Sequence, residues 1–178
     1  MTIDFDNCTA LELWKYIAVH LKKNGIDTIL VGGAVVSIYS SGIYQSGDLD
    51  FLLTDMFTKN LREILGQIGF VQQGGRHYQH PQCKHLFIEF TTGFLSIGED
   101  NKIKPDEVEV EKIKIKILSP TDCVKDRLAS YLYFKSRDCL DQALLVAERH
   151  PVGLEKIKKW SEGENHPEIF AEFKNLLK

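Results

Sequence analysis

The chain has 178 residues, of which 43% are apolar and 26% are charged, a composition that excludes intrinsic disorder and a collagen-like repeat. Its 22 basic and 25 acidic residues give a formal net charge of -3, which excludes a general field for binding polyanions. Any contact with nucleic acid must therefore rest on a local basic patch.

The four cysteines, at positions 8, 83, 123 and 139, form no Cys-x-x-Cys pair, so we expect reduced thiols. The uncharged stretch 28–47 has the length of a membrane span, but its four glycines and four serines exclude one. Asp4 and Asp6 stand where a secretory or mitochondrial signal needs basic residues. We therefore expect a cytoplasmic protein that does not contact a membrane.

Hydrophobic periodicity predicts alternating helices and strands in the first half of the chain. Residues 28–31 belong to a mostly apolar run that ends at a glycine pair, as expected of a strand buried on both faces. In chain order we expect a helix over about residues 11–23, a strand over 26–31, a helix over 34–39, a strand over 48–53, a helix over 59–69, a strand at 70–71 and a third core strand over 85–92.

The alternation of apolar residues changes phase near Glu111 and Lys112. Val108 and Val110 occupy even positions, whereas the isoleucines from Ile113 to Ile117 occupy odd ones. Because side chains alternate between the two faces of a strand, this slip predicts either a β-bulge or two short strands.

Helices make up the rest of the chain. Ser119-Pro120 begins the first one, because serine is a favoured N-cap and proline is favoured at the first helical position. We expect helices over 120–135, 138–149, 152–161 and 167–177. The predicted fold class is α+β: a small mixed sheet with flanking helices over residues 1–118, followed by a helical subdomain over 119–178.

Two features of the first part indicate chemistry. Gly32-Gly33 lies between a strand and a helix, where free backbone N–H groups and the helix dipole favour an anion such as phosphate. Asp48 and Asp50 are two residues apart on the next strand, so both project from one face. Neighbouring carboxylates in an apolar strand require a cation, and Mg²⁺ prefers oxygen ligands. Glu89, on the third strand, is the expected third ligand.

These residues resemble the nucleotidyltransferase superfamily of the polymerase-β-like fold. The resemblance covers residues 26–92: Val31-Gly32-Gly33, a helix, Asp48-Leu49-Asp50 opening a strand, and Glu89 in a later strand. It implies that Gly32 and Gly33 bind the triphosphate of an NTP, and that the three carboxylates are catalytic and hold two Mg²⁺ ions. The sequence departs from the family in having no basic residue between Gly33 and Asp48.

A looser resemblance, to the AbiEii-type toxin branch of this superfamily, covers the helical third. It rests on Val124-Lys125-Asp126-Arg127-Leu128, followed by Arg137-Asp138. The resemblance implies that Lys125 contacts the triphosphate and that Asp138 supports it, with Asp141 a weaker candidate. It also implies toxin–antitoxin function with an antitoxin as a partner. We expect the side chain of Lys125 to look toward Gly33, beside a buried stripe at Val124 and Leu128.

Several alternatives stay open. Glu89 could be a surface residue of an edge strand, and the domain could be a catalytically idle module that binds a nucleotide or a protein. His77, His80, Cys83 and His85 are four potential zinc ligands, but their spacing matches no familiar zinc pattern, so polar loop residues are the favoured interpretation. Arg76, His77 or Lys84 could instead border an acceptor groove. The acceptor hydroxyl could belong to an RNA 3′ end, a protein or a small molecule.

Overall fold

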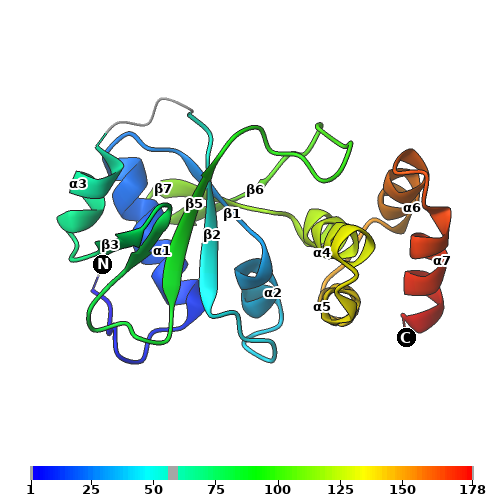
Figure 1. Cartoon of the computed structure of the whole chain (residues 1–178), viewed down its shortest axis with the longest axis horizontal. Helices are drawn as coiled ribbons and strands as arrows, with labels where there is room; N and C mark the ends of the chain where they lie inside the picture. Colours follow the sequence, from blue (N-terminus) through cyan, green and yellow to red (C-terminus); the bar gives the residue numbers. More distant parts are fainter. Residues whose placement is uncertain (1, 56–59, 178) are drawn as a thin grey trace.

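The computed structural model describes residues 2–55 and 60–177 and contains a mixed sheet flanked by helices, followed by a helical C-terminal part (Figure 1). The described helices are α1 (Ala10–Lys23), α2 (Gly33–Tyr39), α3 (Leu61–Gly66), α4 (Pro120–Phe134), α5 (Arg137–Ala147), α6 (Leu154–Gly163) and α7 (Pro167–Leu176). The described strands are β1 (Thr28–Val31), β2 (Asp48–Leu53), β3 (Val71–Gly74), β4 (His77–Gln79), β5 (Phe87–Thr92), β6 (Asp106–Val110) and β7 (Ile113–Ile117).

The sheet has the strand order β3-β4-β5-β2-β1-β7-β6. Strand β2 pairs antiparallel with β1 and parallel with β5, and β1 also pairs parallel with β7. The predicted α+β class with a mixed sheet is therefore confirmed. Because β5 lies between β4 and β2, Glu89 is on an interior strand, and its assignment to a sheet edge is wrong.

Local sequence signals account for the main boundaries. Thr9 and Glu12 form a capping box at the start of α1, and the side chain of Ser119 accepts a hydrogen bond from the backbone N–H of Asp122 at the start of α4. Glu111 and Lys112 have φ values of 51° and 64°, as two-residue hairpin turns require. This turn separates β6 from β7, so two short strands explain the phase slip.

The 71–79 region differs from the prediction. The strand predicted at 70–71 extends to Gly74 and pairs with β4, a short strand that the sequence did not indicate. Gly74 and Gly75 both have positive φ, and the chain turns here between β3 and β4. The helix predicted over 59–69 is α3, which begins at Leu61, whereas Lys59 lies outside the described residues. No helix within the described ranges is long and apolar enough to cross a membrane.

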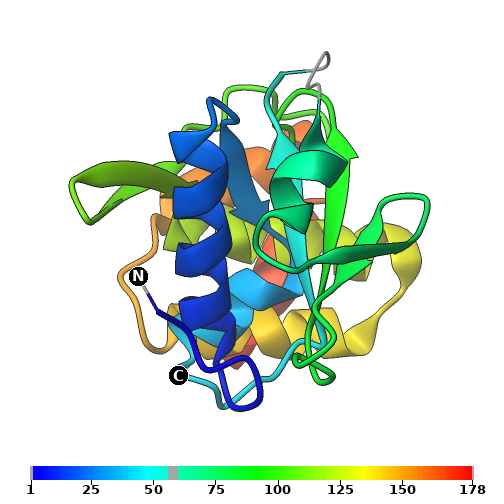
Figure 2. The same ribbon diagram turned by 90° about the vertical axis from the view of Figure 1, so that its left-hand side faces the viewer.

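The sheet separates two groups of helices. Figure 2 shows α1 and α3 on the side of the sheet that faces the viewer and the C-terminal helices beyond it. Helix α2 contacts α4 and α5 and so lies between the sheet and the helical part. Leu49 and Phe51 of β2 are fully buried, which leaves the alternate residues of this strand pointing to the opposite face.

Candidate active site

Three carboxylates project from one face of the sheet. Asp48 and Asp50 alternate with buried Leu49 along β2, and the parallel neighbour β5 places Glu89 in register with Asp50. Residues in register on adjacent strands point to the same face. The structure therefore brings Asp48, Asp50 and Glu89 together, in the arrangement that the sequence predicts.

The negative charges of the three carboxylates are not fully compensated by nearby positive charge. Burial, together with the nearby charges of Asp48 and Glu89, raises the pKa of Asp50 from 3.8 to about 6. Such a shift means that the ionised form of Asp50 lacks sufficient compensation. A divalent cation would supply it, and three carboxylates form an all-oxygen donor set that suits Mg²⁺. The residues present therefore fit the metal that the sequence resemblance implies.

Neighbouring side chains orient the other two carboxylates. Ser46 Oγ donates a hydrogen bond to Asp48 Oδ1 at 2.7 Å. Glu89, whose side chain is 16% exposed, is 2.6 Å from Arg76 Nη2 through one oxygen and 2.9 Å from His77 Nε2 through the other. Arg76 lies in the turn between β3 and β4 and His77 is the first residue of β4, so this hairpin holds the Glu89 carboxylate in place. Both residues were predicted as a possible border of an acceptor groove, and His77 also as a potential zinc ligand.

The glycine pair allows the backbone to approach the carboxylates. Gly32 has φ 74° and ψ -156°, a conformation that is essentially restricted to glycine, and a Cβ at this position would overlap Oδ2 of Asp50. A Cβ at Gly33 would lie 2.9 Å from Ser46 Oγ. The turn from β1 into α2 is therefore in contact with Asp50 and with the residue that holds Asp48.

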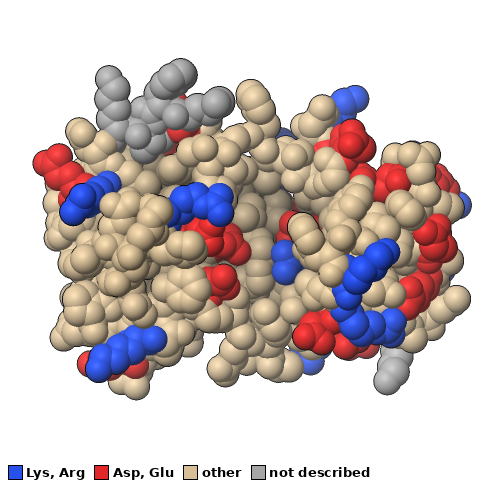
Figure 3. Space-filling model, in the orientation of Figure 1, with Lys and Arg blue, Asp and Glu red and all other residues tan. Residues whose placement is uncertain are grey.

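Arg127 brings positive charge to the carboxylate cluster from the helical part. The guanidinium, on α4, acts on Asp50 as a positive charge and lowers its pKa, opposing the effect of burial. Its side chain is 14% exposed, and Nη2 lies 2.6 Å from Asp126 Oδ2. Figure 3 shows acidic side chains over β2 and β5 on one side of a hollow, with a basic side chain on the wall that the helices form. Sequence reasoning missed Arg127, although it lies within the quoted motif around Lys125.

Solved structures with the same architecture are nucleotidyltransferases or resemble them. An antigenic nucleotidyltransferase-like protein from Paracoccidioides brasiliensis matches with a TM-score of 0.58 at 16% identity, over 93% of this chain and 92% of that chain. The antibiotic-resistance factor ANT(2'')-Ia matches with a TM-score of 0.57 at 10% identity, over 93% and 95% of the two chains. The lincomycin-bound lincosamide antibiotic adenylyltransferase LnuA gives 0.51 at 12% identity, over 81% and 100%.

The chain has the nucleotidyltransferase fold. This confirms the fold that the glycine pair and the spaced carboxylates predicted. No protein-family model matches the sequence, and no curated protein sequence matches it either. None of the likenesses reported above concerns an AbiEii-type toxin, so the toxin branch and an antitoxin partner stay predictions.

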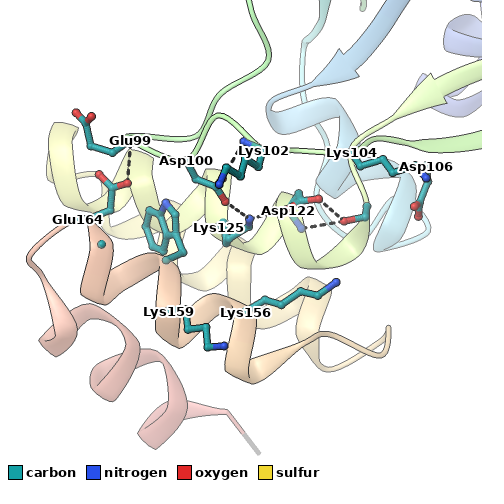
Figure 4. Close-up of a pocket in the computed structure, with 13 residues that line it drawn as sticks. Glu99, Asp100, Lys102, Lys104, Asp106, Asp122, Lys125, Lys156, Lys159 and Glu164 are labelled. Carbon is teal, nitrogen blue, oxygen red and sulfur yellow. Dashed lines mark hydrogen bonds and ion pairs between the residues drawn. The ribbon is translucent and has the colours of Figure 1, made fainter.

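Within this nucleotidyltransferase fold, the predicted position of Lys125 is wrong. Its side chain is only 5% exposed, and Nζ lies 2.9 Å from Asp100 Oδ2 and 2.7 Å from Asp122 Oδ1 (Figure 4). The cavity beside it, of about 630 Å³, is lined by five lysines and five carboxylates and by neither glycine of the pair. Lys125 and Arg127 are separated by about 200° around an α-helix, so they cannot face the same cleft.

Asp138 and Asp141 are exposed on α5, Asp138 in its first turn. Neither is among the charged groups that shift the pKa of Asp50. A carboxylate in the first turn of a helix is favourable for the helix dipole alone. The supporting role of Asp138 at the nucleotide therefore remains a prediction.

The four residues that could have formed a zinc site in the 77–85 loop do not assemble into one cluster. His77 contacts Glu89, and His80 stacks on Phe5 with ring centroids 3.6 Å apart. Cys83 and His85 lie elsewhere, beside Cys8. His77 is therefore a strand residue that contacts Glu89 rather than an ordinary polar loop residue, and His80 packs among aromatic rings.

Proposed function

We propose that this chain is a metal-dependent nucleotidyltransferase that transfers a nucleoside monophosphate from an NTP to an acceptor hydroxyl and releases pyrophosphate. The observation that carries the proposal is the cluster of Asp48, Asp50 and Glu89 on one sheet face, with Asp50 packed against Gly32 and the pKa of Asp50 raised to about 6. Perturbed carboxylates gathered in a hollow are typical of a catalytic site.

In this proposal each residue has a defined task. Asp48 and Asp50 hold the metal ions, with Glu89 completing the ligand set. Two Mg²⁺ ions bound there would stabilise the charge on the transferred phosphoryl group and promote ionisation of the attacking hydroxyl. The backbone N–H groups after Gly32 bind phosphate oxygens, and Arg127 offers positive charge from the helical part.

The acceptor most consistent with the molecule is a small one. The net charge of -3 does not favour a long RNA, and two of the proteins with this fold are described as acting in antibiotic resistance or as an antibiotic adenylyltransferase. We therefore propose a small molecule that carries hydroxyl groups, with RNA 3′ ends and protein hydroxyls as the alternative classes to be assayed beside it.

The test is pyrophosphate release from each NTP with Mg²⁺ and a panel of hydroxylated small molecules, RNA and proteins. We expect turnover that requires Mg²⁺ and is lost in Asp50→Asn, with Glu109→Gln, an exposed carboxylate on β6, as the matched control. Absence of turnover and of any Mg²⁺-dependent thermal shift with every NTP would contradict the proposal.

A catalytically idle nucleotide-binding module is the second candidate. One observation favours it: Glu89 already has an ion pair with Arg76 and a contact with His77, which makes this carboxylate less dependent on a metal. Comparing the thermal shift with pyrophosphate release distinguishes the two functions. An idle module shows a thermal shift with NTP and Mg²⁺ but no pyrophosphate, whereas the enzyme shows both.

A further inference from the structure

Three potential metal ligands meet at a place that the proposed active site does not use. Cys8 lies in the segment before α1, whereas Cys83 and His85 lie between β4 and β5. Their ligand atoms are all within 4.8 Å of one another. Cys8 is 75 residues from Cys83 in the sequence, which is why no spacing motif indicated this cluster.

The distances between these atoms are those of a tetrahedral site. Cys8 Sγ and Cys83 Sγ are 3.9 Å apart, and Cys83 Sγ is 4.0 Å from His85 Nδ1. With ordinary Zn–S and Zn–N bond lengths, tetrahedral angles place two sulfur ligands about 3.8 Å apart and a sulfur and a nitrogen about 3.6 Å apart. Two of the three distances are therefore within about half an ångström of the tetrahedral values. The ligand atoms of Cys8 and His85 lie within 4.8 Å of each other, so a zinc ion fits after a small rearrangement of these side chains.

The imidazole of His85 has the tautomer that a metal ligand needs. His85 Nε2 is 2.8 Å from the backbone carbonyl oxygen of Cys8. Because a carbonyl oxygen only accepts, Nε2 carries a proton in this contact, and the neutral form of the ring then has its lone pair on Nδ1, on the side of the two sulfurs. Metal-bound histidines commonly donate their other N–H to a carbonyl or carboxylate in this way. Here the second shell of a metal site is already formed.

Charge and access also suit a metal. Cys8 and Cys83 are buried, and a divalent ion with two thiolates has no net charge, so burial carries little electrostatic penalty. His85 is exposed, and together with Cys8 it lines a cavity of about 770 Å³. The fourth coordination position can therefore be filled by water from this cavity.

We propose that Cys8, Cys83 and His85 form a binding site for a thiophilic divalent metal ion, Zn²⁺ above all, distinct from the magnesium site at Asp48 and Asp50. On binding, each cysteine releases its thiol proton to solvent, and the two thiolates and His85 Nδ1 coordinate the ion. The ion joins the N-terminal segment to the loop that leads into β5, the strand that carries Glu89. Its effect is therefore on the stability of this part of the fold.

The test uses the full chain, stripped of metal with a chelator and kept reduced, and measures binding of Zn²⁺ and Co²⁺ without any nucleotide. We expect one ion per chain, a thiolate-to-cobalt charge-transfer band and a higher Tm with Zn²⁺. The fold should tolerate His85→Ala because this side chain is exposed. Loss of a direct ligand should weaken binding by at least the roughly 10–100-fold that loss of a second-shell partner costs. Cys83→Ser should abolish the band, whereas Cys139→Ser, a buried cysteine on α5, should leave it unchanged.

Three results would overturn this site. The first is stoichiometric Zn²⁺ binding that His85→Ala and Cys83→Ser leave intact. The second is no binding of Zn²⁺ or Co²⁺ by folded, reduced wild-type chain. The third is a Cys8–Cys83 disulfide in freshly purified protein, detected as the loss of two hydrogens by intact mass spectrometry, which would mark the pair as a redox couple. None of these results depends on whether the chain transfers nucleotides.

Discussion

Asp50 is the residue at which folding and the proposed function oppose each other. Its carboxylate is packed against Gly32 and faces two further carboxylates, so its ionised form is unfavourable in the free protein. The same features make it a strong ligand once a cation is bound. Active sites commonly retain such destabilising groups because substitution there sacrifices function for stability.

Asp50→Asn should therefore stabilise the metal-free protein. The pKa is raised from 3.8 to about 6, and about two pKa units correspond to roughly 3 kcal/mol. The folded state keeps its proton longer than the unfolded state, so this group lowers the stability as the pH rises from about 4 to 6. Urea unfolding in chelator should show that Asp50→Asn is more stable at pH 7 and lacks this decline. Equal stability of the two proteins at pH 7 would contradict the argument.

Gly32→Ala should disturb the site and the fold together. The φ of 74° is strained for alanine, at about 1–3 kcal/mol, and the new methyl group would displace Asp50. Gly47→Ala is the matched control, since a Cβ there meets nothing within 4 Å. We expect the first variant alone to lose stability in urea and affinity for NTP with Mg²⁺. A Gly32→Ala protein that binds NTP normally would show that the glycine pair is only a turn.

At the scale of the element, α4 presents two cations to different surroundings. Lys125 is buried between Asp100 and Asp122, whereas the positive charge of Arg127 acts on Asp50. Because the two residues point to different sides of the helix, Lys125 contributes to stability, whereas Arg127 acts on the proposed site. The buried stripe predicted at Val124 and Leu128 is present, and Lys125, beside it, is buried as well.

Lys125→Met should cost stability and leave nucleotide affinity unchanged. Its removal leaves two carboxylates without their partner, at a cost on the order of 3 kcal/mol, since Asp100 is partly exposed. Adding Asp122→Asn should recover part of this loss in urea unfolding. Weaker NTP binding by Lys125→Met at a temperature where it is fully folded would instead restore the predicted contact with the triphosphate.

Arg127→Met should act on the site. Loss of its charge removes the effect that lowers the pKa of Asp50, so the protonation midpoint of Asp50 should move upward from about 6. A charge-assisted hydrogen bond to phosphate is worth about 1.5–3 kcal/mol, so NTP affinity should fall at least about tenfold. Carboxyl NMR titration and calorimetry measure the two effects. An unchanged protonation midpoint of Asp50 would show that the charge of Arg127 has no effect on the carboxylates.

Elements were predictable from the sequence where the signal is local. The serine cap at Ser119, the helical spacing before Gly25 and the phase slip at Glu111 each act over a few residues, and each marks a boundary correctly. The short strand β4 carries no such signal. The electrostatic effect of Arg127 on Asp50 arises because α4 packs near a strand that is distant in the sequence. Hydrophobic periodicity does not predict such long-range packing.

At the scale of the whole molecule, the sheet and the helical part share one core. Buried apolar residues form a continuous cluster that extends from Cys8 to Phe173. Polar contacts cross the same boundary: His150 Nε2 lies 2.8 Å from the backbone carbonyl oxygen of Tyr39, and Trp160 Nε1 donates to the carbonyl of Ile97 at 3.0 Å. The division at residue 118 proposed from the sequence therefore marks the point where the mixed strands and helices give way to helices alone among the described residues. We do not expect it to separate two independently folding units.

The two tryptophans allow a direct test, because Trp14 lies in α1 and Trp160 in α6. Trp160→Phe leaves a reporter beside the sheet, and Trp14→Phe leaves one in the helical part. Trp160→Phe loses its hydrogen bond to Ile97, worth about 1 kcal/mol. Trp14→Phe removes a buried indole N–H that has no partner among the described residues, so it loses no such bond.

A shared core makes unfolding cooperative, so in each variant the urea midpoint from fluorescence should coincide with that from far-UV circular dichroism. Each variant serves as its own reference, so a difference in stability between the two does not affect the comparison. If the fluorescence of Trp160 changed at lower urea than the circular dichroism while that of Trp14 did not, the helical part would unfold first. The cleft between the sheet and α4 would then join two separable domains, and Arg127 could leave the carboxylates without unfolding the sheet.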